Sequence, residues 1–316
     1  MCKIQDKGVG GFLLDWSAVI AVILSIMFFS FYTGASFLSP ANLTNILRSM
    51  SITTILAVAM TVTLACDGFD MSACTLASCS GYVFMVCYLW YGMSLLLSAA
   101  VCVVFTMTAY LLTLFLILVC RIPDMLATCA LMFIHQGLGQ WFTGGGAISA
   151  GMRLPGGAVP KRMSFETDFV AIGQTPWIIL IMFACVLLAH IFLQHTKQGT
   201  FLYAIGSNKT AAALSGIPVE RYRFLGAMVV CSRNTAAQLC GCDNYLMPSL
   251  AAVFVGRSVG GREKPTALGT VLGAGLIVIL ENGLTLCAVP YYILPAVKGG
   301  VLAAALAAVY LPKRAG

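Results

Sequence analysis

Few residues of this chain have side chains that could do chemistry, and those that carry charge inside apolar runs stand out. Asp67 and Asp70 lie in LACDGFDMSACTLAS, Glu281 lies in LIVILENGLTL, and Lys298 lies in LPAVKGGVLAA. A charge in hydrocarbon costs several kcal/mol unless it faces protein or water, so intramembrane ionisable residues indicate a function. The candidates for lining a path for a polar solute are Asp70, Ser72, Glu281, Asn282 and Lys298.

A simpler role competes for the first of these residues. Gly68 indicates that one membrane crossing ends nearby and that the chain turns, which leaves Asp70 and Ser72 at the start of the next helix. Side-chain oxygens at that position cap the unsatisfied N–H groups of the first helical turn. Capping and path lining therefore both remain open for Asp70.

The charge of Glu281 could be neutralised by Lys298 across a helical bundle. A proton-coupled carrier would use buried carboxylates such as Asp70 and Glu281 as relays. These residues alone do not separate an ATP-driven carrier from an ion-driven one.

Catalytic and metal-binding motifs are missing from the sequence. It contains no G-x-x-x-x-G-K-[ST] and no H-E-x-x-H, and its three histidines are scattered. Most of the thirteen cysteines lie within apolar runs, where cysteine acts as a small hydrophobe, and none forms a C-x-x-C pair. We expect no catalysis by this chain, no cofactor and no metal.

The composition places these residues in a membrane. Hydrophobic residues make up 60% of the 316-residue chain and charged residues only 9%, with a mean hydropathy of +0.94. The apolar runs lie near 16–38, 50–66, 73–91, 93–120, 124–143, 176–195, 222–232, 245–256, 267–289 and 291–311. Because a crossing needs about 20 apolar residues, we predict an all-α polytopic bundle with roughly eight to ten transmembrane helices, some broken or re-entrant. Residues 1–316 form one integral membrane domain.

Orientation follows from the lysines and arginines in the short loops. The net charge of +7 is spread over clusters between apolar runs, which fits the positive-inside bias and argues against nucleic acid binding. We assign the N-terminal tail 1–15, the loop 196–223 and the C-terminus to the cytoplasm. The Gly- and Pro-rich loop 144–175 is then external, either as a connection or as a docking surface for a partner.

A polar, Ala-rich stretch interrupts the apolar pattern at residues 207–223, SNKTAAALSGIPVERYR. Ala211–Ala213 favour a helix, Ser215 and Gly216 favour its end, and Pro218 follows. The pattern predicts a short cytoplasmic helix over 208–216. A helix of two turns is marginal alone in water, so a partner is expected to hold it.

The same stretch resembles the cytoplasmic coupling segment of the ribose-type ABC sugar-importer permeases, which are the transmembrane subunits of binding-protein-dependent transporters. Further blocks that resemble the family include SPANLTNILRSMSITTILAVAMT (39–61), GFDMS (68–72) and AVKGGVLAAALA (296–307). The positions that match the coupling pattern and are expected to meet the ATPase are Asn208, Ala211, Ala212, Ser215, Gly216 and Ile217.

The resemblance implies a permease of the bacterial inner membrane that imports a monosaccharide similar to ribose, xylose or galactose. Its implied partners are an ATP-binding subunit that hydrolyses ATP, a periplasmic sugar-binding protein, a second permease subunit and the lipid bilayer. The alternative is an ion-coupled secondary transporter of a small polar solute that uses buried Asp70 and Glu281.

The sequence also departs from the family pattern. Thr210 stands where the family has Glu, and Cys74 and Ala130 stand where it has Gly. The stretch 224–244 is shorter than in the family and carries Arg233 where an apolar crossing is expected.

Overall fold

The computed structural model describes residues 16–145, 159–164, 173–216, 242–257, 264–297, 299, 300 and 303. Ile217, Lys298, the tail 1–15 and Arg233 lie outside the described residues, as does most of the loop 144–175. Where the structure describes regular elements, they are all helical. The predicted all-α class is therefore confirmed.

Six helical segments are long and apolar enough to cross a membrane within the described ranges. They comprise α2 (Ser17–Thr33) with η1 (Gly34–Ser36), α3 (Pro40–Ala65), α4 (Ala73–Met85) with the π-helix η2 (Val86–Trp90), α5 (Leu95–Leu114) with the π-helix η3 (Phe115–Val119), α8 (Trp177–His195) and α13 (Ala267–Leu286).

The remaining elements are α6 (Asp124–Thr143), α9 (Lys197–Ser207), α10 (Lys209–Leu214), η5 (Cys242–Tyr245), α12 (Leu246–Arg257) and η7 (Tyr291–Ile293). The 12 residues of α12 span about 18 Å, which is less than the hydrocarbon thickness of about 30 Å. Residues 222–232 lie outside the described residues, and of residues 298–311 only 299, 300 and 303 are described. The predicted total of eight to ten crossings depends partly on these two segments.

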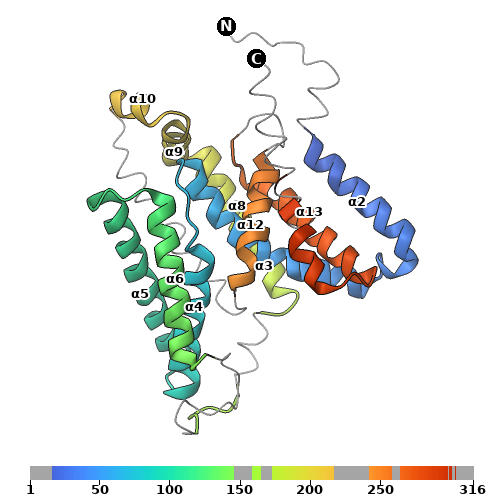
Figure 1. Ribbon diagram of the computed structural model, residues 1–316, viewed down its shortest axis with the longest axis horizontal. Helices are drawn as coiled ribbons and strands as arrows, with labels where there is room; N and C mark the ends of the chain where they lie inside the picture. Colours follow the sequence, from blue (N-terminus) through green and yellow to red (C-terminus); the bar gives the residue numbers. More distant parts are fainter. Residues whose placement is uncertain are drawn as a thin grey trace.

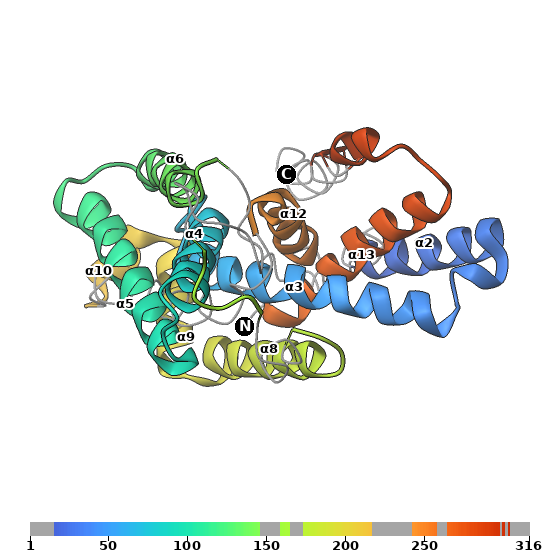
Figure 2. The same ribbon diagram turned by 90° about the horizontal axis from the view of Figure 1, so that it is seen from below.

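Helix α3 forms the centre of the bundle. It packs against α8, α12 and α13, and 72% of its apolar window is buried, compared with 11% for α2. Helices α4, α5 and α6 form a group on one side of α3, while α2 packs against α13 on the other (Figure 1, Figure 2). The other described helices contact α3 either directly or through a helix that does.

The contact between α12 and α13 depends on residues that have little or no side chain. A Cβ on Gly273 of α13 would collide with the carbonyl oxygen of Ala252 on α12, and Gly256 and Gly269 approach each other as closely. Small residues let membrane helices pack backbone to backbone. Beside them, the hydroxyls of Thr61 and Thr270 join α3 to α13 over 2.7 Å.

Adding one methyl group at this contact should loosen the bundle. Gly273→Ala is expected to destabilise the fold by about 1–3 kcal/mol, because the backbone of Ala252 cannot yield as a side chain would. Gly137→Ala in α6 is the matched control, since a Cβ there meets nothing within 4 Å, and it should be neutral or slightly stabilising. Thermal unfolding of the two variants in the same detergent measures the difference, and equal midpoints would contradict the packing described here.

Candidate functional site

The turn between α3 and α4 carries the first candidate residue. After α3 ends, Asp67 adopts a left-handed φ of 56°, a conformation in which Asp and Asn are enriched. The carboxylate of Asp70 accepts hydrogen bonds from the backbone N–H and the hydroxyl of Ser72, both over 2.8 Å. Ser72 is the N-cap residue of α4 but its side chain makes no cap hydrogen bond to the helix, so the side-chain contact at the start of α4 comes from Asp70.

The carboxylate of Asp70 is also buried between helices. The side chain is 7% exposed, and the hydroxyl of Tyr110 on α5 donates to its second oxygen over 3.3 Å. Burial raises the pKa of Asp70, while the hydrogen bonds from Ser72 and Tyr110 oppose that rise. Tyr110 was not a candidate from the sequence, because a lone tyrosine in an apolar run gives no signal of its partner.

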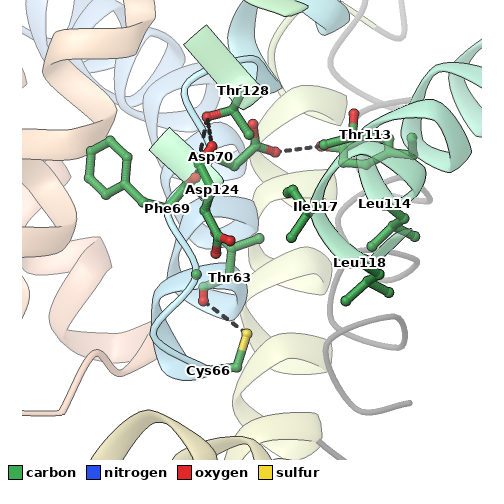
Figure 3. A pocket seen from close by; sticks show the side chains of 12 residues that line it. Thr63, Cys66, Phe69, Asp70, Thr113, Leu114, Ile117, Leu118, Asp124 and Thr128 are labelled. Atoms are coloured by element: carbon green, nitrogen blue, oxygen red, sulfur yellow. Dashed lines mark hydrogen bonds between the residues drawn. The ribbon is translucent and has the colours of Figure 1, made fainter. Parts of the chain in front are cut away.

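Asp70 borders a small cavity shown in Figure 3. Its walls come from the α3–α4 turn, from α5 with η3, and from the first turn of α6, where Asp124 and Thr128 lie. The cavity volume is about 50 Å³, whereas ligand pockets usually measure about 300 Å³ or more. In this conformation the space could hold water but not a sugar.

The described part of the polar stretch, residues 207–216, contains a short helix where the sequence predicted one. The side chain of Asn208 accepts from the N–H of Ala211 over 3.0 Å and caps the start of α10. The helix ends at Leu214 with Ser215 as its C-cap, and Gly216 follows with a φ of 80°, a conformation that favours glycine. The helix is therefore slightly shorter than the predicted 208–216, and Ile217 lies outside the described residues.

The two faces of α10 differ in exposure. Ala212 is 5% exposed and belongs to an apolar cluster with Ala65, Leu202 and Ile205. Leu214 is 85% exposed, and Ala211 and Ala213 are also exposed. Ala212 thus packs inward onto the bundle, and Leu214, which the sequence motif did not single out, is the large apolar side chain on the outer face.

Helices α9 and α10 contact the α3–α4 turn directly. Lys209 of α10 forms an ion pair with Asp67, with 3.3 Å between Nζ and Oδ2, and the two side chains are 44% and 66% exposed. Exposed pairs of this kind contribute about 0–1 kcal/mol. Gly206 of α9 packs on the backbone of Ala65, where a Cβ would collide with the carbonyl oxygen. The coupling stretch and the Asp70 cavity are therefore neighbours.

The other path candidates lie elsewhere. Asn282 of α13 exchanges two hydrogen bonds of 3.0 and 2.9 Å with Asn42, near the start of α3. Asn42 lies in the first turn of α3 (Pro40–Ala65), so the helix separates this pair from the α3–α4 turn by about 35 Å. The side chain of Glu281 is partly buried. The structure therefore does not bring Asp70 and Ser72 together with Glu281 and Asn282, and the suggested pair with Lys298 falls outside the described residues.

Among the residues that the structure describes, no three His, Cys, Asp or Glu side chains gather as metal ligands would. The described chemistry of this region comprises the buried carboxyl of Asp70 with its hydroxyl partners, the half-buried Asp124 in the cavity wall, and an exposed ion pair.

Comparison with known proteins decides the family. A family model described as the permease component of the branched-chain amino acid transport system matches residues 42–310. The chain belongs to this permease family. It is a polytopic membrane protein whose role is transport, and the resemblance found in its coupling stretch is confirmed at the level of the family.

Curated relatives of the chain cover nearly its whole length. It is 30% identical to the ribose import permease protein RbsC of Haemophilus influenzae over 96% of this chain and 95% of the relative. It is 27% identical to RbsC of Escherichia coli strain K12, over 92% of each chain. The xylose transport system permease protein XylH of the same strain is 24% identical over 94% of this chain and 92% of the relative. No solved structure matches the chain significantly.

The buried carboxyl of Asp70 gives the permease a pH dependence that can be tested. A raised pKa in the folded state means that this group stabilises the fold fully below its unfolded value of 3.8, and that the contribution is lost as the pH rises through the folded-state pKa. The melting temperature of the wild-type protein should therefore fall relative to that of Asp70→Asn as the pH rises from 3.8. If the melting temperatures of the wild type and of Asp70→Asn changed with pH in parallel, burial would not raise the pKa of Asp70.

Proposed function

We propose that the chain is the transmembrane permease subunit of an ATP-binding-cassette importer and that it forms the translocation path for a monosaccharide. Support for the substrate class comes from the ribose and xylose permeases that it resembles over most of its length. The observation that carries the coupling role is α10, a capped helix whose outer face presents Leu214 to the surroundings of the bundle.

In this proposal α10 is the contact for an ATP-binding subunit. Leu214, with Ala211 and Ala213 beside it, offers a small apolar knob that a groove of the partner could enclose. ATP is hydrolysed on that partner, and this chain is not an enzyme. Closure of the ATP-binding subunits displaces α10 and switches the permease between outward- and inward-facing states.

The proposed orientation places α9 and α10 in the cytoplasm. Basic residues gather at that end of the bundle, and the described ones include Lys197, Lys209, Arg257 and Lys264. At the same end, the hydroxyl of Tyr203 on α9 donates to the carbonyl of Pro265 over 2.7 Å and so links α9 to the segment before α13. An excess of lysine and arginine is typical of cytoplasmic loops. Both termini would then be cytoplasmic, in a bacterial inner membrane.

The opposite end of the bundle would face the periplasm. There the described part of the loop, 159–164, packs onto the π-helix η2: Arg162 donates to the hydroxyl of Tyr88 over 3.0 Å, and its backbone N–H donates to Leu89. A periplasmic sugar-binding protein would dock on this end and select the sugar. A second permease subunit, identical or related, would complete the path.

The runner-up function is an ion-coupled secondary transporter that uses Asp70 and Glu281. It requires the two carboxyls to act on one solute, and their positions near opposite ends of the bundle do not favour it.

Partner binding gives the first test of the proposal. Leu214→Asp is expected to reduce the amount of ATP-binding subunit that co-purifies with the full chain at least tenfold, because it places a charge in the proposed apolar contact. Leu214→Met keeps the size and polarity of the side chain and should retain the partner. Capture of the same ATP-binding subunit by Leu214→Asp at the wild-type level would overturn the assignment of α10.

The energy source for uptake gives the second test. Accumulation of radiolabelled ribose or xylose by cells that express the chain should stop when ATP is depleted and persist when the proton and sodium gradients are collapsed. Uptake that follows an ion gradient in ATP-depleted vesicles, and that is lost in Asp70→Asn and Glu281→Gln, would instead establish the secondary transporter.

A further inference from the structure

The α3–α4 turn is tied to the coupling helix at two points that flank the cap of α10. On one side of Asn208, the ammonium group of Lys209 pairs with the carboxylate of Asp67. On the other side, Gly206 packs against the carbonyl of Ala65 so closely that no side chain fits between them. The two contacts join both α9 and the first turn of α10 to the end of α3.

The same turn is also fixed to the helices that it connects. The N–H groups of Asp67 and Gly68 donate to the carbonyls of Leu64 and Thr63, over 3.2 and 3.0 Å. A few residues later, Asp70 holds the start of α4 through Ser72 and contacts α5 through Tyr110. Few residues of the turn are left to absorb a displacement of Asp67.

We propose that the Asp67–Lys209 ion pair and the Gly206–Ala65 contact make the α3–α4 turn the element that transmits movement of α10 to the Asp70 cavity. The inference rests on the proposed function, since it assumes that a partner moves α10. When α10 moves, the ion pair keeps Asp67 beside Lys209, and the contact of Gly206 with Ala65 displaces the end of α3. The distance between the cavity walls formed by the turn and by α5 then changes.

The exposure of the ion pair suits this role. Because both side chains remain in contact with solvent, the pair forms and breaks without burying an unpaired charge. The backbone contact at Gly206 is rigid and needs no charge. The Gly206 contact can therefore displace the backbone of Ala65 directly. The exposed ion pair between Asp67 and Lys209 can break and re-form during each transport cycle.

A native thiol reports on the turn. Cys66 is 4% exposed, its Sγ donates to the carbonyl of Thr63 over 3.1 Å, and it lines the Asp70 cavity. A buried thiol reacts only when its surroundings open, so the rate at which Cys66 is labelled measures opening of the turn. Peptide mass spectrometry separates Cys66 from the other cysteines of the full chain.

The first measurement uses the full-length chain in lipid nanodiscs, with a membrane-permeant maleimide. Asp67→Asn, which suits the left-handed φ of 56° at this position, and Lys209→Gln are each expected to speed labelling of Cys66 about two- to fivefold, the range for loss of one exposed ion pair. Because both substitutions remove the same pair, the double variant Asp67→Asn/Lys209→Gln should be labelled no faster than either single variant. Lys197→Gln makes the same charge change at an exposed position of α9 and should have no effect.

The second measurement tests transmission in the complex with the ATP-binding subunit. Adding ATP with vanadate should change the labelling rate of Cys66 in the wild type and in Lys197→Gln, but much less in Lys209→Gln. An unchanged response in Lys209→Gln, or additive effects of Asp67→Asn and Lys209→Gln on the resting rate, would overturn the inference while the importer assignment stands. If no ATP-binding subunit assembles with the chain, the proposed function falls, and the first measurement still decides whether the ion pair holds the turn.

Discussion

The burial of α3 between Ser51 and Ala65 determines how the neighbouring helices of the bundle pack. A helix satisfies its own backbone hydrogen bonds, so in lipid the remaining cost of a long polar-containing segment is that of its side chains. α3 meets that cost by packing hydroxyls and small residues against α8, α12 and α13. Thr61 illustrates this, because its hydroxyl bonds both to the carbonyl of Ala57 and to Thr270. A cluster of polar side chains lies near each end of α3.

The two polar clusters have different consequences. Near the start of α3, the amides of Asn42 and Asn282 satisfy each other and join α3 to α13. Beyond its end, Asp70 retains a carboxyl in a small cavity and Asp67 faces solvent. The first cluster is a complete pair within the chain, whereas the second lies beside the segment that the family resemblance assigns to the ATP-binding subunit. In the proposed importer, movement of α10 reaches the bundle at this second cluster.

Much of this could be predicted from local patterns in the sequence. The apolar runs predicted most of the described helices, and Ala211–Ala213 followed by Ser215 and Gly216 predicted a short helix at the place of α10, because capping and termination depend on neighbouring residues. Contacts between distant residues gave no such signal. The ion pair of Asp67 with Lys209 and the hydrogen bond of Tyr110 to Asp70 depend on how helices pack, which spacing along the chain does not encode. For the same reason Ala212, which fits the family motif, proved to face the bundle, and Leu214 faces outward.

In the proposed importer, an ATP-binding subunit holds the outer face of α10 in the cytoplasm. A photoreactive amino acid introduced at position 214 in intact cells, followed by irradiation and mass spectrometry of the adduct, identifies what lies against this face. We expect a cross-link to a protein with a nucleotide-binding P-loop, formed from the cytoplasmic side. Cross-links to lipid alone, or to a periplasmic protein, would contradict it.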